Sequence, residues 1–225
     1  MKILAVDTAL GACSVAVLSG EQVLSHRYET MERGHAEALA PMVQRAMQAA
    51  EVSFADLERL AVTTGPGTFT GQRVGLAFMR GLRLALKLPL IGVTTLETMA
   101  RTAMEETSAP FGAALHDAKR GEVYVGLYAR GSTLLHPALL PLDSAVQNLR
   151  DALSGRGALL ALAGTASGAT YEQYLALGCS AVATSISAPD ALWVAKLGQE
   201  AAASSEAPRP LYLRPPDARL PARTA

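Results

Sequence analysis

The sequence predicts an α/β fold with two lobes, and three observations lead to this prediction. The first third of the 225-residue chain alternates short apolar runs, typical of strands, with longer helix-like stretches. Hydrophobic residues make up 50% of the chain and charged residues only 18%, so the chain can bury a large core. A change of composition near Ser108-Ala109-Pro110 indicates a boundary between two units.

The N-terminal unit begins with three predicted strands. The apolar runs Lys2–Thr8, Cys13–Ser19 and Gln22–Thr30 are separated by short segments that contain Gly11 and Gly20. Consecutive strands joined by tight turns pair as an antiparallel meander.

Helices and strands then alternate to the end of this unit. We predict helices over Gly34–Glu51, Thr70–Lys87 and Thr94–Glu106, and strands over Arg59–Thr64 and Leu90–Val93. This order is an RNase H-like pattern, the half-unit of the actin, sugar-kinase and Hsp70 superfamily. The predicted fold class is therefore the actin-like (ASKHA) fold with two mixed five-stranded sheets and flanking helices, an analogy of fold alone.

The second half has the marks of a degenerate copy of the first. It contains a predicted hairpin, three helices and two short strands: Phe111–Asp117, Glu122–Ala129, Asp143–Leu153, Ser167–Ala176, Ser187–Ala203, Ala158–Ala163 and Ser180–Thr184. We accordingly predict an N-terminal lobe over 1–108, a smaller C-terminal lobe over 109–207, and a Pro/Arg-rich extended tail over 208–225.

Charge and composition narrow the function classes. Lys+Arg and Asp+Glu are both 20, and aromatic residues are 5% of the chain, which disfavours a stand-alone tRNA-binding module. The tail carries Arg209, Arg214, Arg219 and Arg223, which either attract tRNA phosphates or simply solubilise this end. No apolar stretch approaches the roughly 18–20 residues of a membrane span, and we expect a cytoplasmic protein.

Two segments are candidates for contact with phosphate. Asp7-Thr8 follows the first strand, where an actin-like hairpin would wrap phosphate and its Asp would hold a metal-bound water; a polar turn is the alternative. The second segment, Gly65-Pro66-Gly67-Thr68-Phe69-Thr70-Gly71, precedes a predicted helix, whose N-terminus attracts anions. It lacks the lysine of a Walker A loop, so a capped strand-to-helix turn is an equal alternative. The nucleotide-proximal candidates are Asp7, Thr8, Gly65, Gly67, Thr68, Thr70 and, from a later turn, Asp117.

The two long helices have wider apolar surfaces than one core contact requires. They carry methionines suited to an adaptable contact and small residues that permit close approach of a partner helix. Their candidate interface residues are Leu39, Met42, Val43, Met47, Val74, Gly75, Phe78, Met79, Gly81 and Leu82, with plain burial as the alternative.

The chain resembles the TsaB (YeaZ) family in five segments that cover nearly its whole length. These are Ile3–Ala9 with Ala12–Ala16, Gly65–Gly75, Pro89–Leu96, Asp117–Tyr124 and Pro210–Leu213 with Arg214. The family usually has Ser and Val at the positions of Thr68 and Gln72, where this chain departs from it.

The resemblance implies a non-catalytic structural and activating subunit of the bacterial machinery that makes N6-threonylcarbamoyladenosine (t6A) at position 37 of tRNAs reading ANN codons. The implied partners are a TsaD-type transferase, bound through the two long helices, a TsaE-type ATPase, and tRNA through the complex. Alone, the chain would form a homodimer. No intrinsic cofactor is implied, since the ATP is used by the complex and its partners.

Two positions bear on catalysis. In TsaD-like transferases the strand resembling Leu90–Val93 leads into a His-x-x-x-His metal pair, whereas Thr95 and Met99 stand there in this chain. A neutral hydroxyl and a thioether are poor ligands for zinc or iron, so we expect no catalytic metal and no peptidase activity. The alternative function is a small ATP-binding enzyme, a kinase or ATPase, that uses Asp7, Gly65–Gly71 and Asp117.

Overall fold

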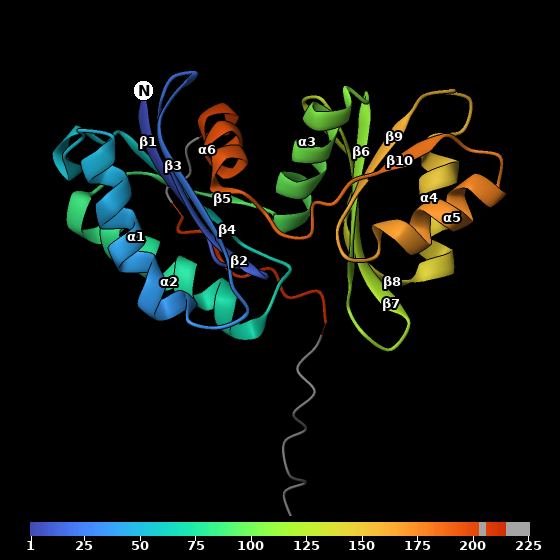
Figure 1. Ribbon diagram of the computed structural model, residues 1–225, viewed down its shortest axis with the longest axis horizontal. Coiled ribbons are helices and arrows are strands. Elements are labelled where there is room, and N and C mark those ends of the chain that lie inside the picture. Colours follow the sequence, from blue (N-terminus) through green and yellow to red (C-terminus); the bar gives the residue numbers. More distant parts are fainter. Residues whose placement is uncertain (203–205, 215–225) are drawn as a thin grey trace, which may run out of the picture.

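A computed structural model describes residues 1–202 and 206–214 and contains two five-stranded sheets, one in each lobe (Figure 1). The first sheet has the strand order β3-β2-β1-β4-β5. Its strands are β1 (Lys2–Asp7), β2 (Ala12–Ser19), β3 (Gln22–Thr30), β4 (Arg59–Thr63) and β5 (Leu90–Val93). The first three strands pair antiparallel, while β4 and β5 add in parallel, which confirms the predicted meander and its helix-linked extension.

The second sheet repeats this topology with the order β10-β9-β6-β7-β8. Its strands are β6 (Phe111–Asp117), β7 (Glu122–Ala129), β8 (Ser132–Pro141), β9 (Leu160–Ala163) and β10 (Ala181–Ala183). Again three strands form an antiparallel meander and two add in parallel. The repeat confirms the predicted fold class of two mixed five-stranded sheets.

Strand β8 was not predicted from the sequence. It contains Pro137 and ends at Pro141, and proline removes a hydrogen-bond donor from a strand. The strand lies at an edge of the sheet, where only one side of the backbone pairs, so the prolines are tolerated there.

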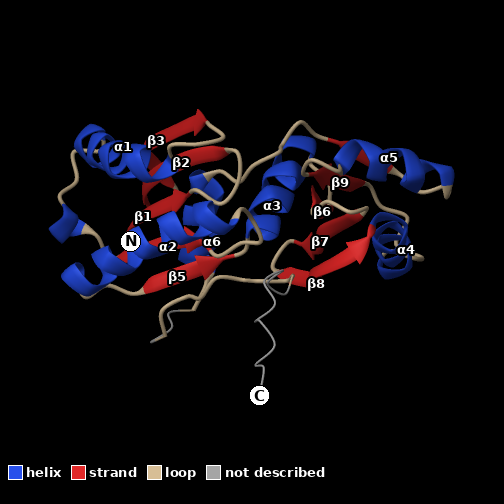
Figure 2. Ribbon diagram, turned by 90° about the horizontal axis from the view of Figure 1, so that it is seen from below, coloured by secondary structure: helices blue, strands red, loops and turns tan. Residues whose placement is uncertain are grey.

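Two pairs of helices cover the outer faces of the two sheets (Figures 1 and 2). In the first lobe these are α1 (His35–Ala49) and α2 (Phe69–Leu86), which pack on β2 and β4 and on each other. In the second lobe α4 (Leu142–Ala152) and α5 (Ser167–Ala176) contact each other and the second sheet. A short 3-10 helix, η1 (Phe54–Asp56), links α1 to β4.

The inner faces of the sheets are covered by α3 (Thr95–Thr107) and α6 (Ala191–Glu200), and each helix packs on the sheet of the other half. Helix α3 follows β5 but contacts β6, β7 and β9, whereas α6 comes from the second half and contacts β1, β2 and β4 (Figure 1). These contacts cross the division predicted at residue 108. The apolar pattern of a helix shows that it has a buried face, but it does not show which sheet buries that face.

The ends of α6 also differ from the predicted range Ser187–Ala203. Asp190 caps the helix, because its side chain accepts a hydrogen bond from the N–H of Leu192. Within residues 1–202 and 206–214, the structure has no helix with both the length and the apolar character needed to cross a membrane.

Candidate functional site

Helices α1 and α2 bury most of the residues predicted to contact a partner. Six of them are buried in the core of the first lobe: Leu39, Met42, Val43, Met47, Gly75 and Met79. In this conformation these six residues do not reach the surface of the lobe. The apolar surface of the two helices is wide because it covers a sheet and also fills the contact between the helices.

Gly75 shows why a small residue is needed inside this core. A Cβ atom at this position would lie 2.7 Å from Oγ1 of Thr8. The absence of a side chain therefore lets α2 approach the turn after β1, where the N–H of Gly75 donates to the same Oγ1 at 3.0 Å.

The opposite face of α2 is exposed and carries apolar side chains beside the exposed Arg73. Phe69 is 63% exposed and Leu84 is 72% exposed, and the exposed small residues Ala77, Gly81 and Ala85 lie between or beside them along the helix. A Cβ atom built on Gly81 meets nothing within 4 Å. Of the predicted interface residues, Gly81 lies on this face, and Val74, Phe78 and Leu82 are half-buried.

The C-terminal segment 206–214, which we call the strap, runs beside α2. The guanidinium of Arg80 donates to the carbonyl of Pro208, and Nε of Arg73 donates to the hydroxyl of Tyr212 at 2.9 Å. The Arg73 guanidinium also lies 3.4 Å from the centroid of the Phe69 ring, which is stacked with Tyr212. Two arginines of α2, Arg73 and Arg80, therefore hold the strap.

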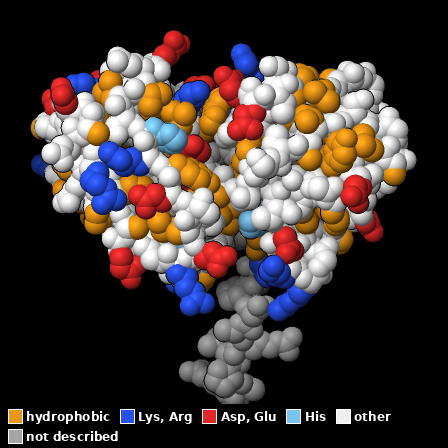
Figure 3. All heavy atoms as spheres, viewed as in Figure 1, with side chains coloured by type: hydrophobic (Ala, Val, Ile, Leu, Met, Phe, Trp, Pro, Cys, Tyr) orange, Lys and Arg blue, Asp and Glu red, His pale blue; other side chains and the backbone are white. Residues whose placement is uncertain are grey.

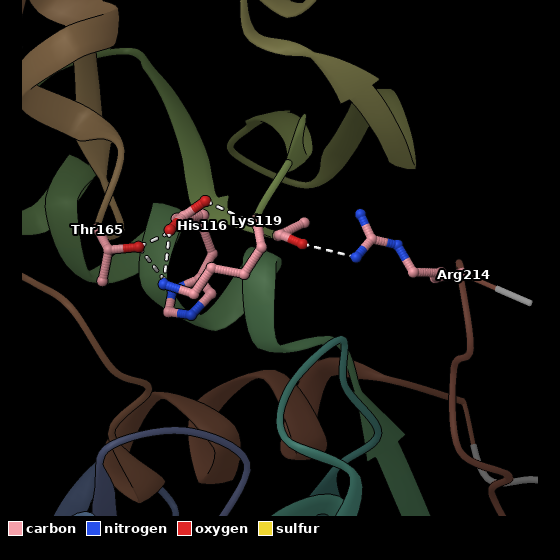
Figure 4. A network of polar contacts seen from close by, with 6 residues as sticks. His116, Lys119, Thr165 and Arg214 are labelled. Carbon is pink, nitrogen blue, oxygen red and sulfur yellow. Dashed lines mark hydrogen bonds and ion pairs between the residues drawn. The ribbon is translucent and has the colours of Figure 1, made fainter. Parts of the chain in front are cut away.

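The strap continues to the second lobe and ties the two lobes together (Figure 4). Arg214 donates to the carbonyl of Ala118 at 2.7 Å and pairs with Oε2 of Glu122 at 2.6 Å. Three residues before Arg214, the N–H of Leu211 donates to the carbonyl of Thr64 in the first lobe.

The sequence prediction of a simple tail missed these contacts. The available signal was the short apolar run Leu211-Tyr212-Leu213 inside a Pro-rich segment. Arg209 is exposed, and the predicted charges Arg219 and Arg223 lie outside the described residues.

The two phosphate candidates, the loops after β1 and after β4, pack against each other. The N–H of Thr68 donates to the carbonyl of Ala9 at 2.9 Å, and the hydroxyl of Thr8 donates to the carbonyl of Gly71 at 2.7 Å. Thr68 also caps α2, since its Oγ1 accepts from the N–H of Gly71, while Thr70 is exposed in the first turn. The geometry favours the capped strand-to-helix turn.

The glycines of this turn serve close packing. A Cβ atom on Gly67 would lie 2.4 Å from the carbonyl oxygen of Ala9, and one on Gly65, at φ +104°, would collide with the side chain of Gln72. Gln72 is 3% exposed and donates to the carbonyl of Gly67 at 2.8 Å. Here the two loops touch each other directly.

Asp7 is completely buried beneath this turn. Its Oδ1 accepts hydrogen bonds from the hydroxyl of Thr63 and from the N–H of Ala9, and its Oδ2 has no partner among the described residues. Burial raises the pKa of Asp7 to about 7, against the hydrogen bond from Thr63, and the charge of Asp190 adds to the rise.

Asp117 lies in an exposed network of the second lobe (Figure 4). Its carboxylate accepts from the N–H and from Nζ of Lys119 at 2.8 and 2.9 Å, which lowers the pKa of Asp117. The hydroxyl of Thr165 accepts from the N–H of Asp117 and lies 3.3 Å from Nδ1 of His116.

A cavity of about 330 Å³ lies between the Gly65–Gly71 turn and the strap. Phe69, Arg73, Tyr124 and Arg214 are among its lining residues, but neither Asp7 nor Asp117 lines it. The structure thus does not bring the two predicted carboxylates to this cavity.

The positions of the expected metal pair are occupied by core residues. Met99 is fully buried among Leu96, Ala100 and their neighbours on the inner face of the second sheet. Thr95 is fully buried, and its hydroxyl has no partner among the described residues.

Comparison with known proteins gives the family. A family model described as TsaD, tRNA N6-adenosine threonylcarbamoyltransferase, matches residues 22–206. A solved structure of YeaZ from Pseudomonas aeruginosa is 32% identical, with a TM-score of 0.77 over 94% of this chain and 99% of that one. The ROK hexokinase of Thermus thermophilus, 16% identical with a TM-score of 0.52, shares the fold alone.

The tRNA threonylcarbamoyladenosine biosynthesis protein TsaB of Escherichia coli is 44% identical over 130 residues. This match covers 58% of the chain and 56% of the relative, so it spans little more than half of that protein's length. An actin-like fold of two lobes is the class that the topology defines. Within that class the chain belongs to the TsaB/YeaZ family.

Proposed function

We propose that the chain is a non-catalytic subunit of the machinery that makes t6A at position 37 of tRNAs reading ANN codons. It acts by binding a TsaD-type transferase in the cytoplasm, together with a TsaE-type ATPase, and it reaches tRNA through that complex. Membership of the TsaB/YeaZ family and the match to the TsaD family model support this proposal.

The exposed face of α2 is the observation that carries the proposed binding. Leu84 is a large apolar side chain in solvent, and Phe69 is 63% exposed although its ring contacts Arg73 and Tyr212. The small residues Ala77, Gly81 and Ala85 leave room for a partner helix to approach closely. A transferase of the same superfamily would cover this face with its own helices. Without it, a second copy of the chain would cover the face, which accounts for the expected homodimer.

The non-catalytic role is supported by the residues themselves. Thr95 and Met99 offer no metal pair, and both side chains are packed in the core. Asp7 is sealed under a closed turn, which disfavours the alternative of an ATP-binding enzyme. The partners accordingly use the ATP, and the isolated chain binds no nucleotide.

The test is co-purification with a TsaD-type transferase, followed by a t6A assay from which each subunit is omitted in turn. Leu84→Glu and Gly81→Leu change exposed positions, so both variants should fold like the wild type. Each should weaken transferase binding by about tenfold or more, because an interface loses most affinity at a few central residues.

Leu175→Glu is the matched control, because Leu175 is 42% exposed on α5 of the second lobe. It should bind and support modification like the wild type. Wild-type affinity of both α2 variants would place the interface elsewhere, and full t6A formation without this chain would refute the proposed function itself.

A further inference from the structure

A second cavity opens between the lobes at the end of the sheets that is remote from Asp7 and Asp117. In the first sheet Lys2 pairs with Ser19, so the turn after β2 lies at the end of β1 opposite Asp7. Phe111 pairs with Ala129, so the turn after β7 likewise lies opposite Asp117. These two turns, with α3 and α6, enclose a cavity of about 660 Å³.

The cavity is rich in charge and contains the chain's single tryptophan. Its cations are Arg101 from α3, Arg130 from the turn after β7, and Lys196 from α6, whose Nζ lies 4.2 Å from the centroid of the Trp193 ring. Its acids are Glu21, Glu105 and Glu200. In Figure 3 basic and acidic side chains gather where the surface is hollowed between the lobes.

Arg101 is the unusual member of this set. It is only 7% exposed, and its Nε has no hydrogen-bond partner among the described residues. One Nη donates to the carbonyl of Ala129 at 3.3 Å, and the other lies 3.6 Å from Oε2 of Glu200. A buried guanidinium normally fills its donors with short contacts, so this one is under-satisfied.

The position of Arg101 also gives a ligand access to it. The residue lines a neighbouring cavity of about 440 Å³ as well, which Glu97 and Glu200 also line. Glu200 is 63% exposed, so its side chain can rotate into solvent at little cost. The guanidinium of Arg101 can then bind another anion. The planar fork of Arg binds carboxylate and phosphate through two parallel hydrogen bonds.

We propose that Arg101, supported by Arg130 and Lys196, forms a binding site for a small oxyanion, a carboxylate or a phosphate. Glu200 is the internal counter-ion that such a ligand displaces. The site lies on the face of the cleft away from the closed Gly65–Gly71 turn, and it is independent of the proposed transferase contact on α2.

Trp193 provides the measurement. Inorganic phosphate and succinate are titrated separately into the full chain at constant ionic strength, with chloride as the balancing anion, and Trp193 fluorescence is recorded. We expect a saturable change with at least one of them, and which one responds distinguishes the two ligand classes. Arg101→Lys should weaken binding about tenfold, since it keeps the charge but loses the fork.

Two exposed variants keep the proposal testable if Arg101→Lys does not fold. Arg130→Ala should weaken binding several-fold, whereas Glu200→Ala should tighten it several-fold by removing the competing carboxylate. Arg150→Ala, a partly exposed arginine on α4, should bind like the wild type. The absence of a saturable change with both anions up to about 20 mM would overturn the proposal. So would binding that neither Arg130→Ala nor Glu200→Ala alters.

Discussion

At the scale of single residues, Asp7 holds a carboxyl group where no water reaches it. Its two hydrogen-bond donors share Oδ1, and the other oxygen has no partner among the described residues. Burial favours the neutral acid, which is why the pKa of Asp7 is about 7 in the folded chain. In the unfolded chain the carboxyl titrates near its ordinary value of 3.8.

This difference predicts how stability depends on pH. Between the two pKa values the folded chain binds a proton at Asp7 that the unfolded chain has lost, so stability falls as pH rises from about 4 to about 7. Asp7→Asn resembles the protonated acid and cannot ionise, so its melting temperature should fall less over this range. Thermal melts followed by circular dichroism at pH 5 and pH 8 would show this, and equal pH slopes in both proteins would contradict it.

The residues near Asp7 also show how far sequence reasoning reaches. The apolar runs correctly placed Asp7-Thr8 at the end of the first strand and Gly65–Gly71 at the passage from β4 to α2. They did not show that the loops meet each other, because Gly67 and Ala9 are separated by most of the first lobe along the chain. Close approach explains the glycines here as well as a bound phosphate would, and only three-dimensional contacts separate the two explanations.

At the scale of elements, apolar side chains lie on two sides of α2, one packed in the core and one exposed to solvent. Met79 is fully buried against the first sheet, whereas Leu84 lies in solvent. The helical period predicted the helix itself, but the apolar residues of α2 cover more than one face, so the period alone did not indicate which of them face the sheet. The burial of six predicted contact residues follows from this ambiguity.

The two faces predict opposite results for the same kind of substitution. Met79→Glu places an unpaired charge in the core and should destabilise the chain by about 3 kcal/mol or more. Leu84→Glu should change the free energy of unfolding by only about 0.5 kcal/mol, as surface changes do. Urea unfolding of both variants measures this. A normally stable Met79→Glu protein would show that Met79 is not a core residue.

At the scale of the whole molecule, the strap joins elements that are remote in sequence. Arg214 pairs with Glu122 at the start of β7, 92 residues earlier, and donates to the carbonyl of Ala118 in the turn after β6, which fixes the strap to the second lobe. Local patterns predicted nearly all strands and helices, but no local pattern encodes such a pair, nor the exchange of α3 and α6. Those contacts follow from topology.

Arg214→Ala should therefore loosen the connection between the lobes. The loss of two charge-assisted hydrogen bonds should cost about 1–3 kcal/mol and speed amide hydrogen exchange at residues 118–122 and 208–213. Arg209→Ala is the control, because Arg209 lies exposed on the same strap. Unchanged exchange in Arg214→Ala would mean that the lobes are held together by α3 and α6 alone.

The exchange of α3 and α6 has a consequence for how the chain matures on the ribosome. The inner side of the first sheet, with Ile3, Ala5 and Ala61, is covered by Ala191, Val194 and Ala195 of α6. Those residues follow the whole second sheet and helices α4 and α5 in the sequence, so they are synthesised after them. Until then the inner side of the first sheet keeps an exposed apolar surface. Slow elongation or premature termination in that interval would leave an incomplete chain with exposed apolar surface that is prone to aggregate. Protection by a chaperone would be needed most at that stage.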